Sequence, residues 1–395
     1  MKRHAVLNEI AMKMKHLLRS AAVPLGLLTG VDSTLAQEWI QTSAPMTNWQ
    51  AAASSADGTK LVAVAGGPIY ISSNSGTTWT QSSAPDRNWL SVASSADGSK
   101  LAAVADRDGI YLSTNGGATW DLSSAPTTSD SVACSADGTR WVAGPALHIS
   151  TDAGVTWTPG SASGGAWSPV ASSADGNTVV GLHFYGEISV STNAGATSTT
   201  TNPNNGYWTS AALSAGGRRI VVACIRRRFQ SLFLPGEILT STNAGATWTL
   251  TTAPGNPWSS VASSADGTKL VAACGSIYTS TNAGATWTSN NVPTANWSSV
   301  ASSADGGKLV AVINGGGIWT LESTPVPALH IVPAGTNLVL SWTMPSTPFV
   351  LQENSDLTPA NWTDVPATLT LNFANLHNQV TLPLPTGDRF YRLRH

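Results

Sequence analysis

Charged side chains are scarce in this sequence: Asp, Glu, Lys and Arg make up only 11% of its 395 residues, and the formal net charge is −2. Nucleic-acid-binding domains usually carry a marked excess of Lys and Arg, so we expect no nucleic-acid partner. The low charge is not that of a disordered chain, because 42% of the residues are apolar and 16 Trp can build a core. The composition is that of a folded protein rich in small residues.

Cysteine is also rare, with three residues, Cys134, Cys224 and Cys274. An odd number cannot form a closed disulfide framework, and the spacing is not that of metal ligands, so we expect no metal and no cofactor. Cys224 and Cys274 fall at equivalent places in successive repeats (see below), which is typical of small buried residues. Helical periodicity is absent throughout, and this indicates an all-β fold.

The N-terminus carries an apolar stretch, residues 21–31, preceded by basic residues and followed by Thr34-Leu35-Ala36. This order is that of a secretory signal peptide. The alternative, an uncleaved membrane anchor, is disfavoured because a span needs about 20 apolar residues. We therefore expect residues 1–36 to be removed near Ala36, no stable membrane span, and a secreted or cell-surface protein.

A repeat dominates the rest of the chain. The tetrapeptide Ser-Ala-Asp-Gly occurs six times and Ser-Ala-Gly-Gly once; the copies begin at Ser55, Ser95, Ser135, Ser173, Ser214, Ser264 and Ser303. Asp-Gly between two strand-like runs favours a hairpin, because Gly accepts a positive φ and Asp bonds its own turn. Each unit holds two further strand-like runs, and four antiparallel strands at this period are typical of a propeller blade. Residues 37–323 are thus predicted to form a seven-bladed β-propeller.

The two ends of the repeat region complement each other. The last unit stops after its third strand, near Ile318–Thr320, while Glu38–Pro45 closely matches the fourth-strand segment Thr78–Pro85. We expect Glu38–Ser43 to supply the missing fourth strand of the last unit. Such closure leaves no open sheet edge, which would otherwise promote aggregation.

A second motif separates the third and fourth strands. It reads Ser73-Asn74-Ser75-Gly76-Thr77-Thr78-Trp79 in the first unit, and further copies begin at Thr114, Thr151, Thr192, Thr242 and Thr281. The motif resembles the Asp-box, or bacterial neuraminidase repeat, Ser-x-Asp-x-Gly-x-x-Trp, mostly with Asn in place of Asp. The resemblance implies a propeller over residues 37–323. Because this repeat occurs in sialidases, xyloglucanases, sortilin-type receptors and photosystem II assembly factors, it does not fix the function. We expect the Asn or Asp to accept hydrogen bonds within the turn and the Trp to pack between sheets.

Six of the seven units open on a Trp, and the third has Ser129 instead; the Trp residues are Trp49, Trp89, Trp167, Trp208, Trp258 and Trp297. We favour packing between neighbouring blades as their role. The alternative is a ring of surfaces on which sugars stack, as in propeller lectins.

Candidate binding residues lie in the loops that join the second strand of a unit to the third, since a rigid scaffold usually places its function on loops. Most of these loops are short, and three are not. They contain Asp106 and Arg107 in the second unit, His183, Tyr185 and Glu187 in the fourth, and Arg226, Arg227, Arg228 and Phe229 in an insertion, residues 225–237, of the fifth. Arg side chains match carboxylate, sulfate or phosphate groups; the alternative for the insertion is a solvated basic loop with a hydrophobic tip. We predict a non-catalytic binding or scaffold protein whose partner is a glycan or an extracellular protein.

Catalysis is the second interpretation, as a sialidase-like or xyloglucanase-like glycoside hydrolase. By family resemblance, a sialidase needs three arginines around the substrate carboxylate, and its Arg-Ile-Pro motif is absent here. A xyloglucanase-type enzyme needs two facing carboxylates and typically two propellers. Tyr185 and Glu187 near Arg226 form the best catalytic set available. We favour binding over catalysis.

After Glu322 the composition changes, and 323–327 reads as a short stiff linker. Residues 324–395 contain five strand-like runs: Leu338–Trp342, Phe349–Glu353, Trp362–Val365, Gln379–Leu382 and Phe390–Leu393. This pattern predicts a small β-sandwich of the immunoglobulin or fibronectin kind, which spaces or attaches the propeller. We expect the whole protein to be a monomer.

Overall fold

The computed structural model describes residues 12–14, 38–161, 166–183, 186–229, 232–322, 329–343, 349–355, 362–385 and 389–394. Every regular element in these residues is a β-strand, and none of them belongs to a helix that could cross a membrane. The predicted signal peptide lies outside the described residues, apart from β1 (Met12–Met14), which pairs with β37 (Arg389–Arg394). Its cleavage therefore stays a prediction.

The repeat units form antiparallel sheets in which the strands follow one another in chain order. The first two units are β3 (Thr47–Ser54), β4 (Leu61–Gly67), β5 (Ile69–Ser72) and β6 (Thr80–Gln81), then β7 (Arg87–Ser94), β8 (Leu101–Ala105), β9 (Gly109–Ser113) and β10 (Asp121–Leu122). The next two are β11 (Ser131–Cys134), β12 (Trp141–Gly144), β13 (His148–Ser150) and β14 (Thr158–Pro159), then β15 (Val170–Ser172), β16 (Val179–Leu182), β17 (Ile188–Ser191) and β18 (Thr199–Thr201). The fifth unit has an extra strand and comprises β19 (Gly206–Leu213), β20 (Ile220–Phe229), β21 (Leu232–Pro235), β22 (Ile238–Ser241) and β23 (Thr249–Leu250).

The sixth unit is β24 (Ser260–Ser263), β25 (Leu270–Ala273), β26 (Ile277–Ser280) and β27 (Thr288–Ser289), and the seventh is β28 (Trp297–Ser302), β29 (Lys308–Gly316) and β30 (Ile318–Glu322). The fourth strand of the seventh unit is β2 (Trp39–Gln41), which pairs with β30 in the register Trp39↔Leu321. The prediction that the N-terminal strand completes the last unit is confirmed. Trp39 is buried there beside Trp297.

A closed cycle of hydrogen bonds joins the alanines of the Ser-Ala-Asp-Gly turns. Each backbone N–H donates to the carbonyl of the equivalent alanine in the next unit, and Ala304 donates back to Ala56 at 2.7 Å. The cycle runs through Ala56, Ala96, Ala136, Ala174, Ala215, Ala265 and Ala304, with N···O distances of 2.7–3.0 Å. We call these residues the alanine ring. The repeat region therefore closes on itself rather than forming an open solenoid.

The Ser-Ala-Asp-Gly turns hold themselves together and also hold neighbouring units. In the second unit, Asp97 accepts hydrogen bonds from Ser95 Oγ (2.6 Å) and from the Ser99 N–H (2.9 Å). Burial is the largest single influence on the pKa of Asp97 and raises it, but these bonds together outweigh it and hold the pKa below its ordinary value. Lys60 of the preceding unit donates to the Asp97 carbonyl (2.8 Å). The predicted turn-forming role of this Asp is confirmed.

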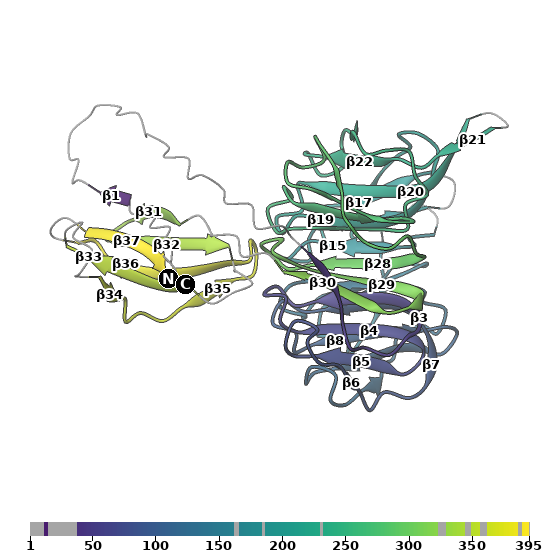
Figure 1. Cartoon of the computed structure of the whole chain (residues 1–395), viewed down its shortest axis with the longest axis horizontal. Coiled ribbons are helices and arrows are strands. Elements are labelled where there is room, and N and C mark those ends of the chain that lie inside the picture. Colours follow the sequence, from purple (N-terminus) through teal and green to yellow (C-terminus); the bar gives the residue numbers. More distant parts are fainter. Residues whose placement is uncertain are drawn as a thin grey trace, which may run out of the picture.

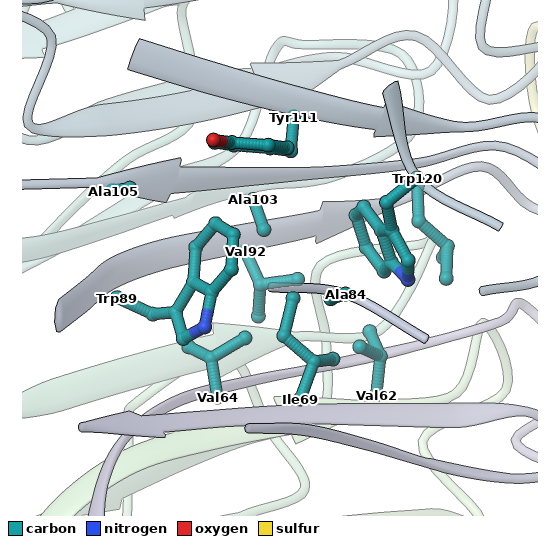
Figure 2. Packing of buried hydrophobic residues seen from close by; sticks show 11 residues of the cluster. Val62, Val64, Ile69, Ala84, Trp89, Val92, Ala103, Ala105, Tyr111 and Trp120 are labelled. Atoms are coloured by element: carbon teal, nitrogen blue, oxygen red, sulfur yellow. The ribbon is translucent and has the colours of Figure 1, made fainter. Parts of the chain in front are cut away.

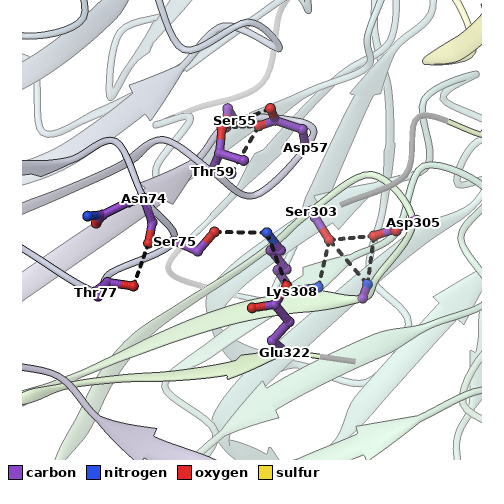
Figure 3. A network of polar contacts seen from close by, with 11 residues as sticks. Ser55, Asp57, Thr59, Asn74, Ser75, Thr77, Ser303, Asp305, Lys308 and Glu322 are labelled. Carbon is purple, nitrogen blue, oxygen red and sulfur yellow. Dashed lines mark hydrogen bonds and ion pairs between the residues drawn. The ribbon is translucent and has the colours of Figure 1, made fainter. Parts of the chain in front are cut away.

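Between the seventh and first units, Lys308 takes the place of Lys60. It donates to Ser75 Oγ (2.8 Å) and forms an ion pair with Glu322 (3.3 Å), beside the Ser303–Asp305 turn (Figure 3). The fourth unit breaks this pattern, because Thr178 stands where the other units have Lys or Arg. The fifth unit, which such a side chain would reach, has Gly216 in place of Asp. The fourth unit thus lacks the basic residue, and the fifth unit lacks the Asp that this basic residue would approach.

The opening Trp residues are buried between units. Trp89 lies among Val64 and Ile69 of the first unit and Val92 of its own (Figure 2). It donates from Nε1 to the Gly67 carbonyl (2.9 Å). Their relative exposures are 0–7%: Trp49, Trp89, Trp167, Trp208, Trp258 and Trp297. Packing between blades is confirmed for these side chains, and the alternative of sugar-stacking surfaces is wrong because the rings of these six residues are not exposed.

The C-terminal segment forms two four-stranded sheets. One is β31 (His330–Ala334), β32 (Asn337–Thr343), β36 (His377–Pro383) and β35 (Thr370–Asn372); the other joins β1 and β37 to β33 (Val350–Asn354) and β34 (Thr363–Asp364). Trp342 and Leu338 from the first sheet and Leu351 and Tyr391 from the second share one core. The five predicted runs coincide with strands, and β31 and β35 were not predicted from the sequence. The expected linker, residues 323–327, lies outside the described residues.

Candidate functional site

The two ends of the repeat units differ in what they carry. Because the strands alternate in direction, the Ser-Ala-Asp-Gly and Asp-box turns lie at one end, which we call the turn end. The connections between second and third strands lie at the opposite end, the loop end. In Figure 1 the C-terminal sheets lie beside the turn end, and the β20–β21 hairpin projects from the loop end. Among the described residues, the insertions of the repeat therefore lie at the end opposite the C-terminal sheets.

The Asp-box turns have the geometry expected of structural turns. Asn74 Oδ1 accepts hydrogen bonds from Ser72 Oγ (3.0 Å) and from the Thr78 N–H (2.9 Å). In the third unit Asp152 does the same, and the bonds from Thr156 lower its pKa to about 2. The predicted acceptor role of these side chains is confirmed, and it occupies them within the turn.

The loop end of the second unit holds a charged cluster. Asp108 pairs with Arg87 and accepts a hydrogen bond from Tyr111 (2.9 Å). The bond from Arg87 is the largest cause of the lowered pKa of Asp108. The predicted residues Asp106 and Arg107 lie beside this pair and form a looser ion pair with each other (3.9 Å). Arg87 was not predicted, although it stands directly before the opening Asn-Trp of its unit.

In the fourth unit the structure corrects one prediction. His183 is buried, and its Nε2 forms a hydrogen bond with Ser189 Oγ (2.8 Å), which in turn bonds Thr200. Burial lowers its pKa, and the charge of Glu187 opposes the shift. His183 is thus a packed side chain rather than a binding residue. Glu187 is exposed as predicted, and Tyr185 lies outside the described residues.

In the fifth unit the predicted loop is a β-hairpin. β20 continues to Phe229 and pairs with β21, in the register Arg226↔Pro235 to Phe229↔Leu232. The predicted residues Arg227, Arg228 and Phe229 therefore lie on a strand, and their backbones are paired. The strand continues because β20 is rich in β-branched residues and finds a partner in the inserted segment. The hairpin is visible at the edge of Figure 1.

Two contact pairs lie at the base of this hairpin, Arg226 with Tyr207 and Asn204 with Glu237, and we call these four residues the Arg226 cluster. The Arg226 guanidinium lies over the Tyr207 ring, 5.0 Å from its centre. Glu237 accepts a hydrogen bond from Asn204 Nδ2 (2.8 Å), and Asn204 Oδ1 is buried without a hydrogen-bond partner among the described residues. This cluster combines a cation, an anion, an aromatic ring and an unused acceptor.

The connection that carries Asn204 also links the fourth and fifth units. Trp208 Nε1 donates to the Gly186 carbonyl (2.8 Å), and Gly206 pairs with Arg227. The loops between the second and third strands of these two units thus both contact this connection. Asp106 and Arg107 belong to the second unit, with the third unit between, so they form a separate cluster.

No protein-family model and no curated protein matches this sequence. Many solved structures are similar to the chain. One is described as YCF48 bound to D1 peptide; it has a TM-score of 0.56 and 14% sequence identity, and the match covers 75% of this chain and 99% of that one. The repeat region is a β-propeller. At this identity the likeness shows the fold and not the function.

Asp130, in the third unit, was not predicted as a site residue, but its surroundings differ from those of the equivalent residues. Directly after the opening Trp, Thr209, Ser259 and Ser298 each donate a hydroxyl bond to a backbone carbonyl of the next unit, at 2.6–2.8 Å. The third unit has Asp130 at this position, and its Oδ1 is buried without a partner among the described residues. Burial raises the pKa of Asp130, and hydrogen bonds with Ser168 and Ser131 oppose the shift. The sequence did indicate that this unit differs, because Ser129, directly before Asp130, replaces the opening Trp of the other six units.

Replacing Asp130 by Ser should stabilise the propeller at pH 7 by about 1 kcal/mol, because a partly buried carboxylate loses hydration that a hydroxyl does not need. The folded-state pKa is raised, so the stability due to the neutral acid is full below the ordinary Asp pKa and is lost as the pH rises through the raised value. The gain should therefore shrink at about pH 3.5, below the ordinary Asp pKa. Urea unfolding at both pH values measures it, with the exposed Asp121→Ser as control. An equal gain at both pH values would contradict the assignment.

Proposed function

We propose that this protein is an exported, seven-bladed β-propeller with a C-terminal sandwich of the immunoglobulin or fibronectin kind, and that it binds a protein partner through its loop end without catalysis. The observation that carries the binding site is the difference between the two ends. The turn end repeats one turn chemistry and is contacted by the C-terminal module, whereas the loop end carries the charged cluster of the second unit and the Arg226 cluster. The seven turns of the alanine ring and the strand β2 support the blade number.

A peptide segment fits the Arg226 cluster better than a sugar does. Tyr and Arg are enriched among the residues that dominate protein interfaces, and Arg226 already lies over Tyr207. Sugar recognition in propellers would favour exposed aromatic faces, and the six opening Trp are buried. The similar YCF48 structure is described as bound to D1 peptide, which is consistent with a propeller of this type binding a protein chain.

Selection from a displayed peptide library against the mature protein tests this proposal. We expect peptides to be enriched, and the double variant Arg226→Ala, Glu237→Ala to bind them about tenfold more weakly or worse, because it removes both charges of the cluster. Val155→Ala is the matched control: Val155 is 70% exposed in an Asp-box turn at the opposite end, so its loss should leave affinity unchanged.

Two results would overturn the proposal. One is equal binding of the selected peptides by the double variant and the wild type, which would move the site away from the Arg226 cluster. The other is the absence of any enriched peptide together with specific binding on a glycan array. Circular dichroism of each variant checks that a loss of binding is not a loss of fold.

A further inference from the structure

A tight turn of the C-terminal module holds an unusual leucine. The turn joins Asn372, the last residue of β35, to His377, the first of β36, and the Leu376 N–H donates to the Asn372 carbonyl (2.8 Å). Leu376 has a φ of +55°, in the left-handed region that Gly or Asn usually occupies. A bulky residue at such a position costs free energy, so a compensating contact for its side chain is expected.

That contact is the alanine ring of the propeller. Leu376 packs against the cluster formed by Ala56, Ala96, Ala136 and Ala304. The backbone N–H and C=O groups of these alanines bond one another around the ring, and the four residues are only 6–8% exposed. Small side chains from several units thus form an apolar seat for one larger aliphatic side chain.

The neighbouring residue makes a second link between the two parts. His377 lies within electrostatic reach of Asp266, the turn Asp of the sixth unit. On its other side His377 stacks on His330, with ring centres 5.9 Å apart. Both links therefore place the same turn of the module against the turn end of the propeller.

We propose that Leu376 is a plug that docks the C-terminal module onto the alanine ring. Leu376 is seated over the centre of the ring, and the module is held at the turn end with the loop end free. The alanine ring thus binds one aliphatic side chain, Leu376, which comes from the β35–β36 turn of the same chain. This docking is argued from the packing of Leu376 against the alanines, and it holds whether or not the loop end binds a peptide.

The variant Leu376→Gly separates docking from turn stability. Gly is the better residue at a φ of +55°, so the turn itself should form at least as well as before. The docking equilibrium constant should nevertheless fall about tenfold or more, because the partly buried leucine side chain and its contact with the alanines are lost. Small-angle X-ray scattering of residues 37–395 should change from one compact particle to two domains on a flexible tether, while calorimetry shows the module melting at an unchanged or higher temperature.

Phe373→Gly is the matched control, since Phe373 is an apolar residue of the same turn, is 40% exposed and does not belong to the alanine cluster. It should scatter like the wild type. Scattering of Leu376→Gly that superposes on the wild type would overturn the proposal, and so would a wild type that is itself a flexible pair. Peptide binding at the loop end should be the same in both variants, so failure of the docking and failure of the proposed function are distinguishable.

Discussion

Trp39→Ala is expected to destabilise the propeller by about 3–5 kcal/mol, the usual cost of removing a large aromatic side chain from a core. Trp39 is 4% exposed, packs with Trp297 and Leu321, and donates from Nε1 to Asn290 Oδ1 (3.2 Å). It also anchors the strand that closes the ring between the two ends of the repeat region. The substitution therefore weakens one core and loosens β2, which leaves the edge of β30 exposed to aggregation.

Ile40→Ala provides the control, because Ile40 lies on the same strand and is 63% exposed. It should change the free energy of unfolding by less than about 0.5 kcal/mol. Urea unfolding gives both values, and light scattering during a thermal ramp reports aggregation. If the two variants unfold at the same urea concentration, β2 does not hold the ring closed.

Gly98→Ala should destabilise the propeller by about 2 kcal/mol, mainly through backbone strain. The φ of Gly98 is +66°, where an L-residue costs about 1–2 kcal/mol. A Cβ there would also come within 2.7 Å of the Lys60 side chain, which crosses from the preceding unit to bond the Asp97 carbonyl. Lys60 can move, but only by giving up that bond between units. The loss of stability should be measured by urea unfolding at neutral pH.

The same substitution at Gly216 is the comparison. Gly216 is outside the positive-φ region, and no atom lies within 4 Å of the position its Cβ would take. Gly216→Ala should be neutral or stabilise by up to about 1 kcal/mol, since it restricts the unfolded chain. Similar losses for both variants would mean that neither backbone strain nor contact with Lys60 explains the glycine of the turn.

The repeat architecture could be predicted because its signals are local. The Asp-Gly turns and the Asn or Asp of the Asp-box bond their own neighbours, as Asp97 and Asn74 show, so a few adjacent residues are enough to specify each turn. The closing strand could be predicted for a different reason: Glu38–Pro45 repeats the sequence of a fourth strand and so must find the same partner. For the C-terminal module the stronger strands were predicted, but β31 and β35, which are short or mostly exposed, lacked a clear pattern.

The candidate site was predicted only in part, because exposure and partners depend on residues distant in sequence. His183 is in a loop by sequence, yet Trp167 and Ser189 bury it. The inserted segment of the fifth unit has strand composition, but only its pairing with β21 makes it a hairpin. In the sequence Asp130 looks like any other carboxylate of the propeller. Only the structure shows that it is partly buried and bonded to Ser168 of the neighbouring unit.

By itself, the sequence determined the all-β repeat architecture, the position of the turns and the strand that closes the ring, because each depends on short-range bonding repeated at a fixed period. The tertiary structure decided what the ring brings together. It made the alanines a continuous hydrogen-bonded ring, placed Leu376 of the C-terminal module against it, and assembled Asn204, Tyr207, Arg226 and Glu237 from two neighbouring connections. These contacts join residues far apart in the chain, and no local pattern specifies such a pairing.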